Sequence, residues 1–168
     1  KTTQCGSNRV LGGINIMVAH GRWSKTYSSL PSHNTVYLKM KLYMVDYWGV
    51  STDHVDISIG GSDFWWNVGS IYASYAPADK WGSPSYPDLD PMMVYAKIPH
   101  TSSSRTLEAI DHFSFTSETQ SFAIRDVTMT FATESTVPPY SYCGVTSGYP
   151  LSSYPCDCGF GTTMNPAN

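Results

Sequence analysis

Apolar and polar residues alternate along residues 36–47, with the side-chain period of a β-strand that buries one face. The apolar set, which should face the core, consists of Val36, Leu38, Met40, Leu42 and Met44. The residues between them, which should point the other way, are Tyr37, Lys39, Lys41 and Tyr43. This pattern predicts a long strand that packs one face on the interior of the protein.

Shorter alternating or β-branched runs recur along the chain, whereas helical apolar spacing is scarce and Pro and Gly interrupt often. We predict strands at 13–19, 36–47, 55–59, 64–68, 92–98, 105–108 and 121–131. In the last of these, the apolar residues share one face if a bulge intervenes near Asp126. Those residues are Phe122, Ile124, Val127, Met129 and Phe131. Many short strands between Gly, Pro and Ser corners predict an all-β fold, an antiparallel β-sandwich.

Two stretches depart from the strand pattern. Residues 69–91 are long, rich in aromatics and broken by Pro, which is typical of a functional or interface loop. Residues 133–168 are rich in Ser, Thr, Tyr, Pro, Gly and Cys and lack apolar periodicity, so they cannot form a core of their own. We therefore predict a sandwich domain at 1–132 and an irregular tail at 133–168 that packs on the sandwich or on a neighbouring subunit.

The composition excludes several classes of partner. Charged residues make up only 14% of the 168 residues, the net charge is −3, and no Lys/Arg run occurs, so neither nucleic acid nor an anionic membrane is an expected partner. No segment approaches the roughly 18 apolar residues of a membrane span. Few charges with many Tyr, Ser and Thr favour an extracellular protein, and the start at Lys1 fits a processed form or a portion of a chain.

Four cysteines occur, at Cys5, Cys143, Cys156 and Cys158, and an even count in such a chain favours disulfides. A bond between Cys156 and Cys158 would close a strained ring across one residue. We therefore expect Cys5 to pair with Cys156 or Cys158 and Cys143 to take the other. Zinc held by the Cys-x-Cys pair is disfavoured, because no second Cys pair or nearby His has ligand spacing.

The order of several motifs resembles that of an extracellular β-sandwich module repeated in surface proteins of ciliates and other protists. The motifs are CG at 5–6, LGGIN at 11–15, SKTYSSLPSH at 24–33, YMVDYW at 43–48, IPH at 98–100 and SFAIRDV at 121–127. The family pattern runs LGGY, K-x-F-x-N-L-P-P-H, I-D-S-W-D-x-E, a lone His and D-E-S-W-G-I, and the match covers about residues 5–132. The resemblance implies a jelly-roll-like, ligand-binding or adhesive ectodomain and not a catalyst.

Acidic residues of two family motifs are missing here. The chain has DYWGVS at 46–51 and TQSFAI at 119–124, so both motifs lack acids that the family carries. Calcium needs about six to eight oxygen ligands, so we expect no cofactor and no calcium site, unless Glu118, Asp53 or Asp56 substitutes by a shift of register. Asp46, beside Trp48, is then expected to be a structural corner residue that accepts backbone hydrogen bonds.

Two histidines, His33 and His100, match positions of the family motifs. We interpret both as structural imidazoles hydrogen-bonded at strand ends, the alternatives being a metal pair or a pH switch. The sequence has no G-x-S-x-G motif. It has several carboxylates, but no sequence pattern places two of them face to face across a cleft, as a glycosidase requires. We therefore expect no enzymatic activity.

The aromatic cluster is the most suggestive candidate for an interface or ligand site: Trp65, Trp66, Tyr72, Tyr75, Trp81 and Tyr86. Aromatic side chains anchor protein contacts or stack on sugar rings. The first hypothesis is a structural subunit that self-associates into a homopolymeric fibre or coat. The alternative is a carbohydrate-binding module that uses exposed Trp and Tyr. No Asn-x-Ser/Thr sequon occurs, so only O-linked or hydroxyproline-linked glycans are considered.

Overall fold

The computed structural model describes residues 1–13, 15–18, 20–46, 53–60, 91–113 and 120–136 with their side chains. It describes 65–68 and 141–145 by their backbone. Within these ranges all regular elements are strands. They are β1 (Thr2–Cys5), β2 (Asn8–Gly12), β3 (Arg22–Ser28), β4 (Thr35–Asp46), β5 (Val55–Ile59), β6 (Trp65–Val68), β7 (Met92–Pro99), β8 (Ser104–Asp111), β9 (Gln120–Ala132) and β10 (Ser141–Val145).

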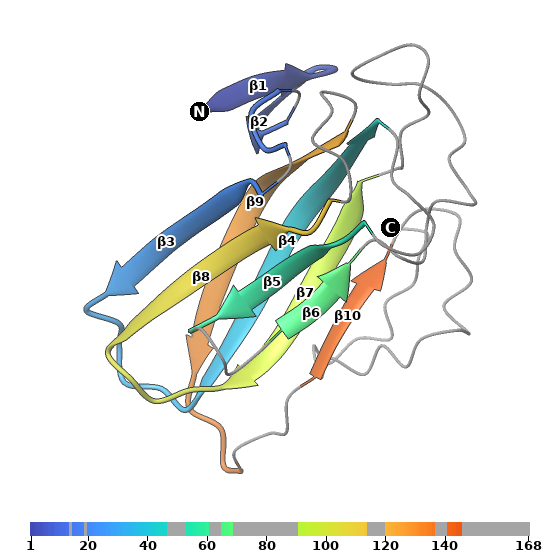
Figure 1. Cartoon of the computed structure of the whole chain (residues 1–168). Coiled ribbons are helices and arrows are strands. Elements are labelled where there is room, and N and C mark those ends of the chain that lie inside the picture. The colour runs from blue at the N-terminus through green and yellow to red at the C-terminus, as the bar shows by residue number, and fades with distance from the viewer. Residues whose placement is uncertain are drawn as a thin grey trace.

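The strands form two antiparallel sheets, which confirms the predicted all-β, antiparallel class. The six-stranded sheet has the order β1-β2-β9-β4-β7-β10, and the four-stranded sheet has the order β3-β8-β5-β6. Figure 1 shows the four-stranded sheet lying across the six-stranded sheet. The core lies between them, since its buried residues come from β4, β7 and β9 of one sheet and from β5 and β8 of the other.

The long strand β4 follows its apolar pattern. Leu38, Met40, Leu42 and Met44 are fully buried in the core, as the alternation predicts, and Val36 is buried as well. Full burial of one such side chain contributes about 1.5–3 kcal/mol. This strand lies between β9 and β7 in the sheet, which explains why its inner face is so uniformly apolar.

The opposite face of the six-stranded sheet carries a second, smaller core. It consists of Cys5, Val10, Tyr43, Val45 and Ala123. Tyr43, which was expected to point away from the interior, is 2% exposed in this cluster. The pairing of β1 with β2, and of β2 with β9, supplies the residues that bury Tyr43. The alternation along β4 does not predict these residues, because they come from other strands.

The predicted bulge in β9 is confirmed. The register between β4 and β9 shifts between Lys39 and Lys41, and Asp126 has a φ of 55°. The extra residue in β9 turns Val127 and Met129 toward the core that Phe122 and Ile124 already fill. Side chains before and after the bulge therefore face the same way.

The strand predicted at 13–19 is wrong. Gly13 and Asn15 have φ angles of 89° and 57°, and the N–H groups of Ile16 and Met17 both donate to the carbonyl of Gly13. These residues form a turn, because left-handed backbone cannot continue a strand. The apolar residues that suggested a strand, Ile16 and Met17, still pack on the core, from the turn.

The tail predicted at 133–168 contributes one strand within the described part of the chain. Residues Ser141–Val145 form β10, which pairs antiparallel with β7 at the edge of the six-stranded sheet. Strands β1, β2 and β3 also lie where none was predicted. Among the described residues there is no helix that is long and apolar enough to cross a membrane.

Candidate functional site

Three side chains with metal-binding atoms meet on the outer face of the four-stranded sheet: His54, Asp56 and His112. His54 precedes β5 and Asp56 lies within it, so alternation puts both on the face opposite to buried Val55 and Ile57. His112 follows β8, the neighbour of β5. The N–H of His112 donates to the carbonyl of His54 at 2.8 Å, which sets the two histidines side by side.

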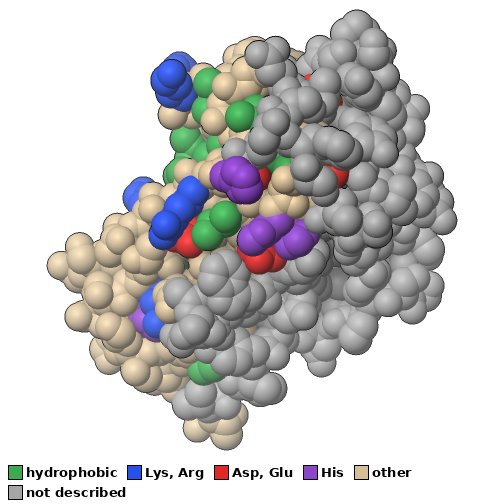
Figure 2. Space-filling view, viewed as in Figure 1, with side chains coloured by type: hydrophobic (Ala, Val, Ile, Leu, Met, Phe, Trp, Pro, Cys, Tyr) green, Lys and Arg blue, Asp and Glu red, His purple; other side chains and the backbone are tan. Residues whose placement is uncertain are grey.

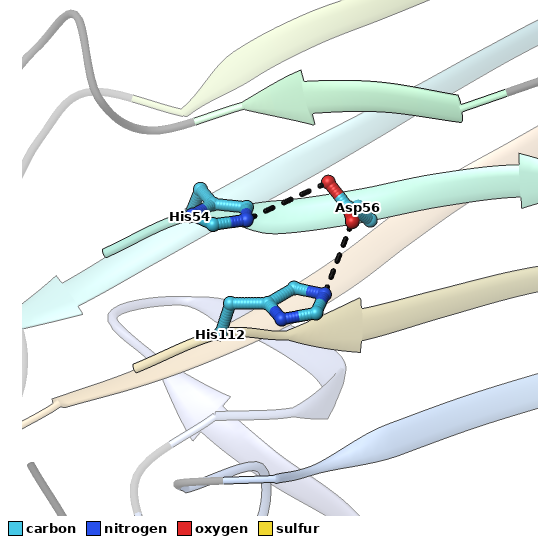
Figure 3. A group of neighbouring side chains, drawn as sticks. All are labelled: His54, Asp56 and His112. Atoms are coloured by element: carbon cyan, nitrogen blue, oxygen red, sulfur yellow. Dashed lines mark ion pairs between the residues drawn. The ribbon is translucent and has the colours of Figure 1, made fainter. Parts of the chain in front are cut away.

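The carboxylate of Asp56 lies beside the two imidazoles and has one ion-pair contact with each of them (Figure 3). Its Oδ2 atom is 3.0 Å from Nε2 of His112, and its Oδ1 atom is 3.8 Å from Nε2 of His54. The two rings are stacked, with centroids 4.6 Å apart and an interplanar angle of 13°. One nitrogen of each ring therefore converges on the same carboxylate.

The cluster is accessible from solvent. The side chains of His54 and Asp56 are 23% and 21% exposed, and that of His112 is 47% exposed. Figure 2 shows histidine side chains near the middle of this face, with acidic atoms beside them. On the same sheet the guanidinium of Arg22 pairs with Glu108. Among the described residues, the carboxylate of Asp56 is the negative charge that contacts the two histidines.

A buried carboxyl lies next to the cluster in sequence but faces the interior. Asp111 is 1% exposed, and its Oδ1 atom accepts from the N–H of His20 at 2.6 Å. Burial raises the pKa of Asp111, and hydrogen bonds from the backbone of His20, Phe113 and Gly21 act in the opposite direction. The side chains of Asp111 and His112 therefore lie on opposite faces of the sheet.

The corner residue Asp46 and the possible calcium ligands Asp53 and Asp56 do not all meet at one place. Asp46 ends β4 with a φ of 62° and lies opposite Gln120 of β9. The side-chain amide of Gln120 donates to Oδ2 of Asp53 at 2.7 Å, and Asp46, Asp53 and Gln120 are all buried. Asp56 instead lies on the outer face of β5. Trp48 and Glu118 fall outside the described residues, and the role of Asp46 as a backbone acceptor stays a prediction.

The two histidines singled out from the motifs, His33 and His100, lie together. Nε2 of His33 is 2.5 Å from Nδ1 of His100, and both residues are 6% exposed. The rings of Phe131 and His33 pack edge to face, with centroids 5.0 Å apart. This pair lies at the ends of β4 and β7, whereas the other pair of histidines flanks β5 and β8.

The aromatic and cysteine candidates lie mostly outside the described side chains. The backbone of Trp65 and Trp66 belongs to β6, and that of Cys143 belongs to β10. Cys5 is buried in the second core. The remaining candidates, which all fall outside the described residues, are Tyr72, Tyr75, Trp81, Tyr86, Cys156 and Cys158.

Sequence reasoning missed the cluster of His54, Asp56 and His112. One local signal was present: His-x-Asp at 54–56 within a strand pattern places an imidazole and a carboxylate on one face. The third member is 56 residues further along the chain than Asp56, and only the pairing of β5 with β8 brings it near. No local pattern marks that pairing.

Comparisons of the chain with protein-family models, with curated proteins and with solved structures find no match. The resemblance of the motif order to the protist surface module therefore stays a prediction. The function proposed below rests on the sequence and on the geometry of the described residues.

Proposed function

We propose that this protein is a non-enzymatic, extracellular structural subunit that self-associates into a fibre or surface coat. The observation that carries the proposal is the position of β10. A segment of the predicted tail, Ser141–Val145, adds to the edge of the six-stranded sheet by pairing with β7 along Met93–Lys97. A tail able to add a strand to its own sheet is also able to add it to the same edge of a neighbouring copy.

Strand addition offers a simple route to a polymer. The main-chain hydrogen bonds between β10 and β7 are the same whether the two strands belong to one copy or to two. Exchange of an identical element between copies costs little, and a head-to-tail contact that does not close yields a filament. The donated strand would thus bond each subunit to the next.

The strand order supports a jelly-roll sandwich as the frame of this subunit. Omitting the outermost β1 and β10, the sheets read β2-β9-β4-β7 and β3-β8-β5-β6. This is the arrangement expected when two Greek keys wrap eight strands into two sheets. Jelly rolls occur in capsid subunits, in lectins and in cupins, so the fold is compatible with a coat protein and does not by itself decide the function.

The extracellular assignment rests on the low charge, the four cysteines and the motif resemblance. A disulfide from Cys5 to Cys156 or Cys158 would tie the tail to the second core. O-linked or hydroxyproline-linked glycans on the Ser-, Thr- and Pro-rich tail fit the same environment. Free thiols at all four cysteines of the native protein would contradict this assignment.

Sedimentation velocity and negative-stain imaging of the native protein test the assembly. We expect particles far larger than the 18.5 kDa chain, in the form of filaments or coats. A monomer at all concentrations would contradict the proposal. If that monomer bound glycans in a Trp81-dependent manner, the carbohydrate-binding alternative would replace it.

Proline substitutions in β10 test the route. Neighbouring residues of a strand direct their N–H groups to opposite edges, so one of Gly144→Pro and Val145→Pro removes a bond to β7. The other proline substitution removes an N–H group that points away from β7, and that variant is the matched control. We expect the variant that disrupts pairing with β7 to lose the large particles. Unchanged assembly in both variants would exclude strand donation by β10.

A further inference from the structure

The outer face of the four-stranded sheet holds a convergent set of two imidazoles and one carboxylate. We propose that His54, Asp56 and His112 bind a divalent transition-metal ion of the zinc class, through Nε2, a carboxylate oxygen and Nε2. This inference goes beyond the proposed structural function and does not depend on it.

The separations of the donor atoms fit one small ion. Zinc bonds to His nitrogen and carboxylate oxygen are about 2.0–2.2 Å long, so tetrahedral ligands lie roughly 3.3–3.5 Å from one another. The distances from Asp56 to the imidazole nitrogens, 3.0 Å and 3.8 Å, lie on either side of that range. All ligand atoms lie within 4.8 Å of one another. Small side-chain rotations therefore complete the site, without movement of the strands.

The backbone holds the three ligands in place before a metal arrives. The register of β5 with β8 pairs Val55 with Asp111, and the hydrogen bond from the N–H of His112 to the carbonyl of His54 extends that ladder by one residue. The ligands thus project from two hydrogen-bonded neighbours in a sheet. Asp56 lies within β5 and the two histidines directly adjoin β5 and β8, so binding orders less chain than it would at a site built on long loops.

The chemistry of the donor set selects the class of metal. Imidazole nitrogen suits zinc, copper, nickel and iron, whereas calcium and magnesium require mostly oxygen ligands. Three ligands from the described residues leave one tetrahedral position to be filled, and the exposed side chain of His112 places the site within reach of solvent. Water could fill it. One carboxylate also leaves a bound divalent ion with net positive charge, which favours an anionic fourth ligand.

Isothermal titration of the metal-free full-length chain with Zn²⁺ tests the proposal. We expect one ion to bind per chain, and no binding of Ca²⁺ or Mg²⁺ at this site. His54→Gln, His112→Gln and Asp56→Asn should each weaken Zn²⁺ binding by at least about tenfold, since even loss of a residue that only supports a ligand typically costs 10–100-fold. His20→Asn, at an exposed histidine with a φ of 65°, is the matched control and should bind as the wild type does.

Co²⁺ gives a second measurement that does not depend on affinity. The intense visible bands of four-coordinate Co²⁺ should appear with the wild type and with His20→Asn, and should be absent from the Asp56→Asn variant. Near-ultraviolet circular dichroism of each variant confirms that the fold is retained. Absence of Zn²⁺ binding by the wild type would overturn the proposal. Equal binding by all three ligand variants, or loss of binding in a His33→Gln variant alone, would also overturn it.

Failure of this site and failure of the structural function are distinguishable. Sedimentation reports assembly in the metal-free protein, and titration reports the metal in whichever assembly state the protein has. A polymer that does not bind zinc would leave the structural proposal intact. A zinc-binding monomer would leave only this inference standing.

Discussion

Nε2 of His33 lies 2.5 Å from Nδ1 of His100, although the two residues are 67 positions apart in the chain. Nδ1 of His33 is also 2.5 Å from the carbonyl oxygen of Pro31, to which it must donate. In the neutral form of His33, Nε2 is then the acceptor, and the Nδ1–H of His100 donates to it. The contact ties the segment before β4 to the residue that follows β7.

We expect His100→Ala to lower the free energy of unfolding by about 1–3 kcal/mol, because it removes the donor to a buried nitrogen of His33. Urea denaturation measures the effect. In a double-mutant cycle with His33→Ala, the double variant should lose less than the sum of the two single variants. His20→Asn serves as the control and should change stability little. Strict additivity of the two alanine substitutions would show that the pair is not coupled.

The carboxylate of Glu134 should contribute stability that depends on pH. The Tyr37 hydroxyl donates to Oε1, and Nζ of Lys97 lies 2.9 Å from Oε2. Both contacts hold the pKa of Glu134 below its ordinary value of 4.5. The pKa of Glu134 is lower in the folded protein than in the unfolded chain. Its contribution to stability is therefore complete at a pH above the unfolded pKa, and it is lost as the pH falls through the folded pKa.

We therefore expect Glu134→Gln to lower the free energy of unfolding at neutral pH, and the difference from the wild type to vanish in strong acid. Urea denaturation at a series of pH values measures this. Tyr37→Phe removes the hydrogen bond that lowers the pKa of Glu134 most, and should flatten the same pH dependence in part. A difference that stayed constant at every pH would assign the effect of Glu134→Gln to packing rather than to charge.

The bulge at Asp126 should depend on its backbone conformation more than on its charge. Asp126 has a φ of 55°, and its Oδ2 atom pairs with Nζ of Lys41 at 3.2 Å on the surface. Asp126→Ala should cost about 1–2 kcal/mol, because alanine disfavours left-handed backbone. Asp126→Asn, which loses the ion pair but tolerates this conformation, should cost less. If the two variants were equally unstable by thermal unfolding, the ion pair would be the cause.

Gly12 should not accept a side chain. Its φ is 89°, and an added Cβ would lie 2.9 Å from the carbonyl oxygen of Phe122 and 2.6 Å from Sδ of Met17. The carbonyl belongs to β9 and cannot yield as a flexible side chain does. We expect Gly12→Ala to lower the free energy of unfolding by about 1–3 kcal/mol through backbone strain, with an added cost for the clash. Gly6→Ala, at a φ of 57° in an exposed turn, is the control, and equal losses would exclude the clash.

The strands that the sequence predicts correctly are those whose pattern is local. The alternation along β4 predicts which of its residues are buried. Successive side chains of a strand point to opposite faces of the sheet, and this does not depend on which strands pair with it. The bulge near Asp126 is predictable for the same reason, since two apolar sets in one strand are out of phase by one residue. Strands β1 and β3 escaped prediction because few of their side chains are buried, which leaves a weak apolar pattern.

The sequence by itself determined which residues face inward along the long strands. Side chains of a single strand alternate between its two faces, and the face that carries the apolar residues is the one that is buried. Tertiary structure alone decided that β5 lies beside β8, that β4 meets β7 and β9, and hence that His54 and Asp56 face His112. Sheet order is set by the competition among all strands for partners, and main-chain hydrogen bonds are alike in every pairing. No local sequence pattern at either residue therefore predicts which side chains meet across two strands.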